Sequence, residues 1–257
     1  MAPPQLLRGL SAPFAGLVAV VVVAAWFVVW ATSDMMMALM GVPIFPPRLL
    51  DLALFFALLV VMMVAMMLPS ALPMMIAFRG LTRLDAGRPV RPADDIASTL
   101  FVIPYFLVWG CFAVVALLGL VGLGFVGTMA GPVGRFLAFV PGITLLVAGA
   151  WQVTRTKEVC LSHCASPMGF VMRHWRSGRL GAFRMGLRHS MYCIGCCWLF
   201  MIVLFVAGAM SLAWMGGVSL MIFVEKLGVR PLLVSRAIGV LLIALGSLAA
   251  VGTILAM

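Results

Sequence analysis

Residues 52–78 read LALFFALLVVMMVAMMLPSALPMMIAF, a run of 27 residues without a charged side chain. An α-helix of about 20 apolar residues is long enough to cross the hydrocarbon core of a bilayer. The run therefore predicts a transmembrane helix. Pro69 and Pro73 each remove a backbone hydrogen bond, so they predict a kink whose freed carbonyl groups need partners inside the protein.

The rest of the sequence has the same character. Hydrophobic residues make up 65% of the 257 residues and charged residues 9%, whereas soluble proteins have roughly 45–50% apolar and 25% charged residues. We therefore predict an all-α, polytopic transmembrane helix bundle, with residues 1–257 forming a single integral membrane domain. A net charge of +10 is here explained by basic loops that face lipid headgroups, so we expect membrane lipids and no nucleic acid as partners.

Six apolar runs predict six spans. They lie at about residues 14–31, 52–78, 99–123, 136–153, 191–224 and 237–257. The fifth run is too long for one upright span and short for two, and Gly208, Gly216 and Gly217 offer places to break it, so seven spans are the alternative. Between spans four and five, residues 155–188 predict a long polar loop that can include a short amphipathic helix.

The basic residues decide the expected orientation, because cytoplasmic loops carry the excess of Lys and Arg. With a cytoplasmic N-terminus, six spans place 12 of the 17 Lys and Arg residues inside and 5 outside. Seven spans give 15 and 2, because Lys226, Arg230 and Arg236 change sides. Either count places the 155–188 loop in the cytoplasm, which is reducing, so we expect free thiols there.

The sharpest candidate site is a group of thiols and one imidazole at the start of the fifth span. If a helix begins near Arg188, then His189, Cys193 and Cys197 are spaced i, i+4 and i+8 on one face. Cys196 lies beside that face. Thiolate and imidazole ligands suit Cu(I) and Zn(II). The alternative is that these cysteines are small apolar residues in a membrane helix.

A second group, Cys160, His163 and Cys164, lies in the 155–188 loop. Its residue order differs from the Cys-x-x-Cys-His motif of haem attachment, and it lacks the full spacing of a zinc finger. The sequence leaves several ligand sets open. Four ligands can be drawn from Cys160, Cys164, Cys193 and Cys197, with His163 and His189 as alternates.

Met66 and Met67 are weaker candidates, each four residues after another methionine of the run. Thioethers suit Cu(I), but methionine also fills irregular gaps in membrane packing. In the expected orientation the second span ends in the cytoplasm, where the fourth ends and the fifth begins. All three groups are therefore expected to meet near the inner leaflet.

Other residues receive plainer interpretations. We expect Glu225 and Lys226 to form an interfacial ion pair, and Cys111 to lie in the core of the third span. Four arginines near the second cysteine group can bind lipid phosphate or an anionic partner, although a solvated basic loop is the commoner outcome. They are Arg173, Arg176, Arg184 and Arg188.

Residues 181–198, GAFRMGLRHSMYCIGCCW, resemble a bacterial family described as predicted metal-binding integral membrane proteins, or domain of unknown function 2182. The likeness extends over about residues 62–246. It includes the run 66–69, the pair Cys160 and Cys164, the turn 175–178 and the pair 225–226. Ser190 departs from the glycine expected after the histidine. The resemblance implies a multi-span protein of the bacterial inner membrane with a metal site, and it gives no established activity.

These observations together predict a metal-handling protein that binds, delivers or transports copper, or in second place zinc, at a cytoplasmic-side site. A metallochaperone or metalloenzyme is the expected partner, and the oligomeric state is open. One alternative is a membrane oxidoreductase or monooxygenase-like enzyme whose cysteines cycle between thiol and disulfide. The other is a structural subunit of a membrane complex.

Overall fold

The computed structural model describes residues 4–36, 49–82, 84–85, 88–89, 94–127, 138–206 and 211–255. Gly208, one of the expected break points, lies outside these ranges.

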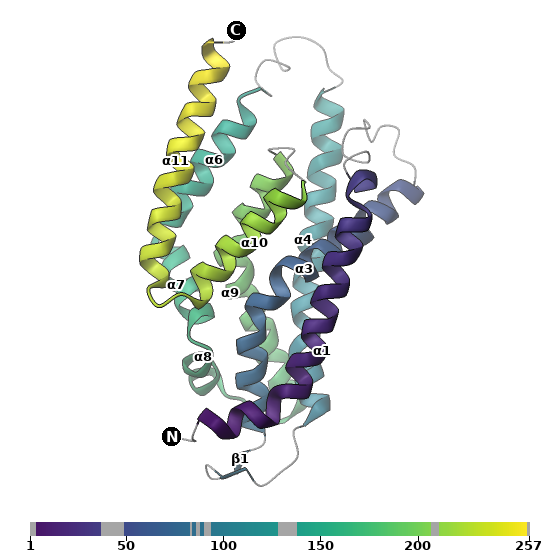
Figure 1. Cartoon of the computed structure of the whole chain (residues 1–257), viewed down its shortest axis with the longest axis vertical. Coiled ribbons are helices and arrows are strands. Elements are labelled where there is room, and N and C mark those ends of the chain that lie inside the picture. The colour runs from purple at the N-terminus through teal and green to yellow at the C-terminus, as the bar shows by residue number, and fades with distance from the viewer. Residues whose placement is uncertain are drawn as a thin grey trace.

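The described chain is helical apart from one short pair of strands (Figure 1). The helices are α1 (Pro4–Ala31), α3 (Leu49–Thr82), α4 (Asp95–Gly127), α6 (Val140–Gln152), α7 (Arg155–Ala165), α8 (Pro167–His174), α9 (Gly178–Val206), α10 (Leu212–Leu227) and α11 (Pro231–Leu255). The strands β1 (Leu84–Asp85) and β2 (Arg88–Pro89) pair antiparallel between α3 and α4. The predicted helical fold class is confirmed.

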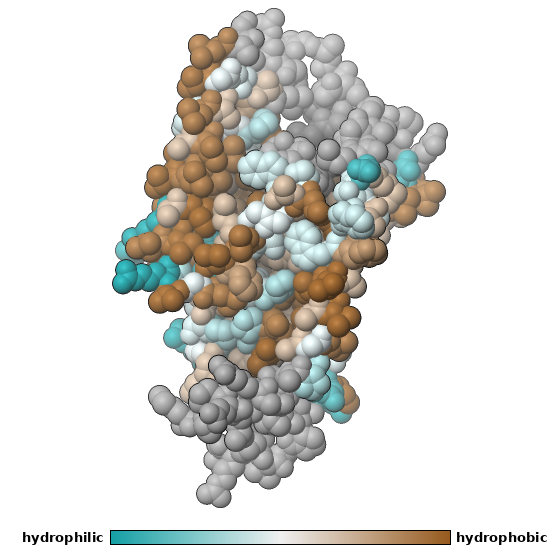
Figure 2. Space-filling model, in the orientation of Figure 1, coloured by the Kyte–Doolittle hydropathy of each residue, from teal (hydrophilic) through white to brown (hydrophobic). Residues whose placement is uncertain are grey.

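Five described helices contain segments long and apolar enough to cross a membrane. These are Pro13–Ala31, Leu49–Thr82, Asp95–Gly119, Gly178–Val206 and Pro231–Leu255, and α6 is a shorter apolar helix. Figure 2 shows an extensive apolar surface over α11, where Val240 and Leu248 are 66% and 70% exposed. Such a surface is compatible with a multi-pass membrane protein.

Residues 155–188 are mostly folded into helices, where we expected a loop. They form α7, α8 and the first turns of α9. The hydroxyl of Thr154 caps α7 by accepting a hydrogen bond from the Lys157 amide, and Pro167 opens α8. Gly178, at φ 80°, provides the left-handed turn into α9. The many polar residues suggested a loop, but one face of each helix is buried.

The apolar run 191–224 is divided between α9 and α10, where our preferred prediction has one span. Glu225, near the end of α10, pairs with Lys157 of α7, and Arg236 of α11 pairs with Glu158 of α7 at 2.8 Å. The turn between α10 and α11 is therefore level with α7. Arg236 therefore lies at the level of α7, whereas α10, with 16 residues, is not among the five described helices long and apolar enough to cross a membrane.

Glycines allow two pairs of helices to approach closely. A Cβ atom on Gly149 of α6 would lie 2.7 Å from the Gly239 carbonyl oxygen of α11, and one on Gly186 of α9 would collide with the Phe101 carbonyl of α4. Small residues at such crossings let membrane helices pack backbone to backbone. The contact at Gly186 holds α9, the main cysteine-bearing helix, against α4.

Candidate metal centre

Four buried thiols and one thioether gather where α3, α7 and α9 meet. Cys196 Sγ lies 4.0 Å from Cys164 Sγ, and Cys197 Sγ lies 3.7 Å from Met67 Sδ. Metal–thiolate bonds are about 2.3 Å long, so two sulfurs on one ion stand up to roughly 4.6 Å apart. Both pairs fall within that limit. The term sulfur cluster is used below for Met67, Cys164, Cys193, Cys196 and Cys197, which are all buried.

The sulfur cluster lies about midway along its long helices. Cys193 stands about 22 Å from the start of α9 at Gly178 and about 20 Å from its end, at 1.5 Å per residue. We expected the thiols near the first turn of this helix, because we took the helix to begin close to Arg188. About three helical turns, which carry Arg179, Arg184 and Arg188, precede this point, so the cluster lies farther along α9 than we expected.

A buried ammonium group faces the cluster. Lys226 of α10 is 3% exposed, and its Nζ lies 3.1 Å from Cys193 Sγ and 3.3 Å from Ser70 Oγ of α3. The Tyr105 hydroxyl of α4 lies 4.0 Å from the same thiol. A positive charge beside a thiol favours the thiolate, so Cys193 is the cysteine best placed to carry a negative charge.

Lys157 and Glu225 form a second buried charged group, which anchors α10 to α7. Their side chains are 0% and 1% exposed and their charged atoms lie 2.8 Å apart. Lys157 also donates to the Cys196 carbonyl. Our prediction of an interfacial pair between Glu225 and Lys226 was wrong, because adjacent helical residues point in different directions. Each of the two reaches a different neighbouring helix.

The other two thiols of α9 are hydrogen-bonded to their own helix. Cys196 and Cys197 both donate to the Cys193 carbonyl oxygen, at 3.1 and 2.8 Å. A cysteine binds a metal as the deprotonated thiolate, so binding of a metal here would release protons and replace these hydrogen bonds.

Cys160 lies at the edge of the cluster, one helical turn before Cys164. Its sulfur packs on Gly195 of α9, where a Cβ atom would lie 2.8 Å away. Burial raises the pKa of the Cys160 thiol. Contact with Cys196, followed by burial, raises the pKa of the Cys164 thiol. Both thiols of α7 are therefore held in the protonated form until a metal or a base takes the proton.

His189 is buried without a hydrogen-bond partner for either ring nitrogen among the described residues. Its ring stacks between Phe101 and Tyr105, with centroids 6.0 and 6.3 Å away. Buried polar atoms are nearly always paired, so an imidazole without a partner, one turn before Cys193, fits the chemistry of a metal ligand.

The other residues considered in the sequence analysis make different contacts from those of the sulfur cluster. His163 stacks on Tyr192 at 4.2 Å, and its Nδ1 is bonded to the Val159 carbonyl at 2.8 Å. Met66 is buried, and its carbonyl accepts from Ser219 at 3.3 Å. Cys111, which we expected in the core, is exposed on α4. Over the described ranges no three His, Cys, Asp or Glu side chains are already arranged to hold an ion.

Three residues beside the cluster were not singled out from the sequence: Lys157, Ser70 and Tyr105. Lys157 precedes Cys160 by three residues and Cys164 by seven, so it shares their face once 155–165 is known to be a helix. This spacing could have identified Lys157 from the sequence as a neighbour of the two cysteines. No pattern in the sequence marks Ser70 or Tyr105, whose positions depend on how α3 and α4 pack.

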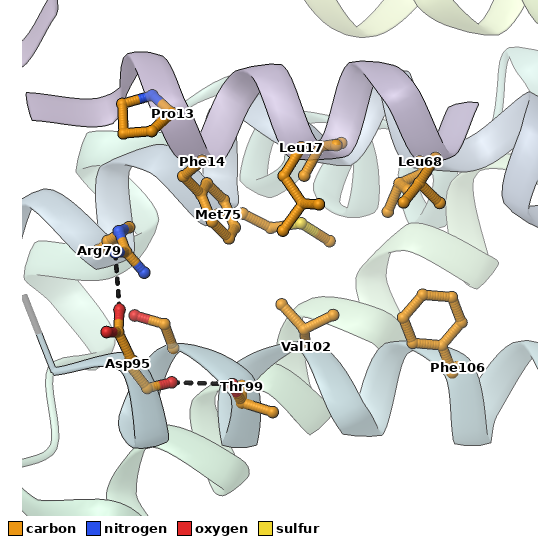
Figure 3. Close-up of a pocket in the computed structure, with 13 residues that line it drawn as sticks. Pro13, Phe14, Leu17, Leu68, Met75, Arg79, Asp95, Thr99, Val102 and Phe106 are labelled. Atoms are coloured by element: carbon orange, nitrogen blue, oxygen red, sulfur yellow. Dashed lines mark hydrogen bonds and ion pairs between the residues drawn. The ribbon is translucent and has the colours of Figure 1, made fainter. Parts of the chain in front are cut away.

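A separate cavity of about 500 Å³ lies between α1, α3 and α4 (Figure 3). Its walls are mostly apolar, and the ion pair of Arg79 with Asp95, at 2.6 Å, stands at one end. The Arg79 guanidinium also lies 5.0 Å from the centre of the Phe14 ring. Met75 supplies the cavity's one sulfur, so the cavity does not have the ligands of a soft-metal site.

A protein-family model described as PpoB2, copper chaperone, matches residues 56–249, about three quarters of the chain. The match includes all five members of the sulfur cluster, together with Lys157, His189 and Lys226. No curated protein and no solved structure matches the chain.

Proposed function

The chain belongs to the PpoB2 copper chaperone family, and from that premise we propose that it binds Cu(I) at the sulfur cluster and delivers it to a metalloenzyme or a second metallochaperone. The proposed ligands are Cys164, Cys193, Cys196 and Cys197, with Met67 as a thioether ligand. Further candidates are His189 and Cys160. We place the protein in the bacterial inner membrane with a cytoplasmic N-terminus, which agrees with the basic residues around α7 and α8.

The observation that carries the proposal is the close approach of thiols from α7 and α9 to a thioether of α3, with Lys226 beside them. Thiolate and thioether sulfur are soft ligands that select Cu(I). Packing alone accounts for small buried thiols, but it does not account for a buried ammonium group placed 3.1 Å from one of them.

Counting charges favours a monovalent ion. The ion pair of Lys157 with Glu225 is neutral as a unit, so Lys226 remains as a positive charge that needs compensation in a low-dielectric interior. When two of the four proposed cysteines bind Cu(I) as thiolates and the other two remain protonated thiols, the complex carries one negative charge in total, which Lys226 neutralises. The same two thiolates holding Zn(II) are already neutral, and Lys226 would leave an unpaired positive charge.

Six methionines of α3 are proposed as a path along which Cu(I) moves to or from the sulfur cluster. Met62, Met63, Met66, Met67, Met74 and Met75 are all buried, with exposed fractions of 0–3%. Thioether ligands are uncharged, so they hold Cu(I) more loosely than thiolates do and suit transfer rather than storage. Because Met67 contacts Cys197, the row meets the sulfur cluster directly.

The test is elemental analysis of detergent-purified protein made without a histidine tag. Wild type is expected to retain stoichiometric copper, and Cys193→Ser/Cys197→Ser is expected to lose most of it. Cys111→Ser is the matched control, since Cys111 is an exposed thiol on α4. Equal, sub-stoichiometric copper in all three proteins would contradict the proposal.

A thiol titration of the same samples separates delivery from a redox enzyme. The 4.0 Å separation of Cys164 and Cys196 sulfurs is short enough for thiol–disulfide chemistry, which needs two neighbouring cysteines. A chaperone keeps both thiols reduced through cycles of copper loading and release. Loss of two thiols per cycle would favour the oxidoreductase instead.

A further inference from the structure

Outside the sulfur cluster, the most unusual feature is a small cavity whose lining carries three arginines. It lies where α8 ends and α9 begins, has a volume of about 210 Å³, and is lined by His174, Arg176, Arg184, Met185 and Arg188. Arg184 and Arg188 are four residues apart and share one face of α9. Water takes up about 30 Å³ in the liquid, so the cavity can hold a group several times larger.

No carboxylate of the described residues pairs with these arginines. From Val159 to Val224 the sequence contains no Asp or Glu. Within the described ranges, Arg176, Arg184 and Arg188 form no salt bridge, whereas Arg79 and Arg236 each have a carboxylate partner. Three guanidinium groups around one cavity repel each other unless an anion joins them, and arginine matches phosphate with paired hydrogen bonds.

The surroundings of the cavity indicate which anion would reach it. Met172, Trp175, Leu180 and Leu187 flank the arginines in sequence and are 68%, 42%, 63% and 40% exposed. Exposed apolar side chains next to arginines, with a tryptophan among them, are typical of the boundary between lipid tails and headgroups. Figure 1 shows α8 toward the end of the molecule where α1 begins and where β1 joins α3 to α4.

We propose that this cavity binds the phosphate of an anionic phospholipid headgroup, with the exposed apolar side chains against its acyl chains. Arg176, Arg184 and Arg188 bind the phosphate. His174 closes one side of the cavity, where its Nδ1 donates to the Phe170 carbonyl at 3.1 Å. Bound lipid would fix α8 against the first turns of α9, the helix that carries three of the cluster's thiols. This site is separate from the proposed copper site.

The test uses native mass spectrometry of the full-length protein transferred from vesicles of phosphatidylglycerol and phosphatidylcholine. Wild type is expected to retain phosphatidylglycerol in preference to phosphatidylcholine. Arg184→Gln/Arg188→Gln is expected to weaken retention by roughly 30-fold, because each basic residue near an anionic lipid contributes about 1 kcal/mol. The matched control is Arg173→Gln/Arg179→Gln, which removes two exposed arginines of the same segment that do not line the cavity.

Three further results complete the test. Arg184→Lys/Arg188→Lys should recover part of the retention, because the charge returns without the paired geometry. If inorganic phosphate binds to wild type but not to the Gln variant, while lipid retention is equal in both, the source is a free phosphate and the lipid assignment is wrong. Equal retention of phosphatidylglycerol by the cavity and control variants, with no phosphate binding, would overturn the site altogether.

Discussion

Replacing Lys226 with methionine is the most informative single change in this chain. The substitution removes the ammonium group 3.1 Å from Cys193 Sγ and leaves a side chain of similar length. At 3.1 Å and an effective dielectric constant of about 20, two unit charges attract by about 5 kcal/mol. Two thiolates that hold Cu(I) carry one negative charge in total, so this attraction stabilises the loaded state.

If half of that attraction survives desolvation and relaxation, Lys226→Met weakens Cu(I) binding by about 2.5 kcal/mol, or roughly 60-fold in Kd. Binding of Zn(II) between two thiolates should change little, because that complex is already neutral. The expected result is therefore a loss of preference for copper, measured by competition with Cu(I) and Zn(II) chelators on the same protein. Lys226 has no carboxylate partner among the described residues, so Lys226→Met leaves no buried acid unpaired, and the variant should fold.

Arg236→Gln is the control, since it removes one positive charge from an exposed pair with Glu158 on the same side of the bundle. It should leave both affinities unchanged. If Lys226→Met binds Cu(I) as tightly as wild type does, the charge argument fails. If both metals weaken equally in Lys226→Met, the lysine supports the site only by packing.

Further predictions concern the groups around the cluster. Lys157→Met leaves Glu225 buried without a partner and should cost about 3–5 kcal/mol of unfolding free energy in a thermal or denaturant assay, whereas Lys157→Met/Glu225→Leu should recover most of it. His189→Phe keeps the aromatic stack and removes two unpaired nitrogens, so it should raise the stability of the copper-free protein by about 1–3 kcal/mol while weakening copper binding; unchanged copper affinity would remove His189 from the ligand set. Gly186→Leu forces a side chain against the Phe101 backbone and should cost about 1–3 kcal/mol of stability, with no loss expected for Gly216→Leu, which faces open space. Because the pKa of the Cys164 thiol is raised, copper must displace its proton at neutral pH, so copper affinity should increase with pH; a competition titration that is flat across neutrality would contradict this.

The helical architecture could be predicted from the sequence because its cause is local. Long uncharged runs allow few structures other than helices, so most of the predicted spans coincide with observed helices. The spacing of His189, Cys193 and Cys197 likewise predicted one helical face, and all three are buried on α9. Thiols of α7 and α9 were expected to meet, and the contact between Cys164 and Cys196 agrees with that expectation.

Other features could not be predicted because they depend on packing between distant segments. Residues 155–188 contain many polar side chains, so the sequence suggested a loop. The apolar faces of α7 and α8 are buried only by contacts with other helices. Glu225 and Lys226 are adjacent in the sequence, yet one reaches α7 and the other reaches α9. Cys111 was expected in the core from its residue type, but it lies on an exposed face of α4, which the sequence does not reveal.

X-ray absorption spectroscopy at the copper edge tests the central claim most directly, because it reports which atoms surround the bound ion. In copper-loaded wild type the account predicts Cu(I) in a first shell dominated by sulfur. Cys164→Ser/Cys196→Ser should lose sulfur from that shell or fail to load at all. A shell of nitrogen and oxygen only, or one unchanged in the double variant, would show that copper binds elsewhere in the protein.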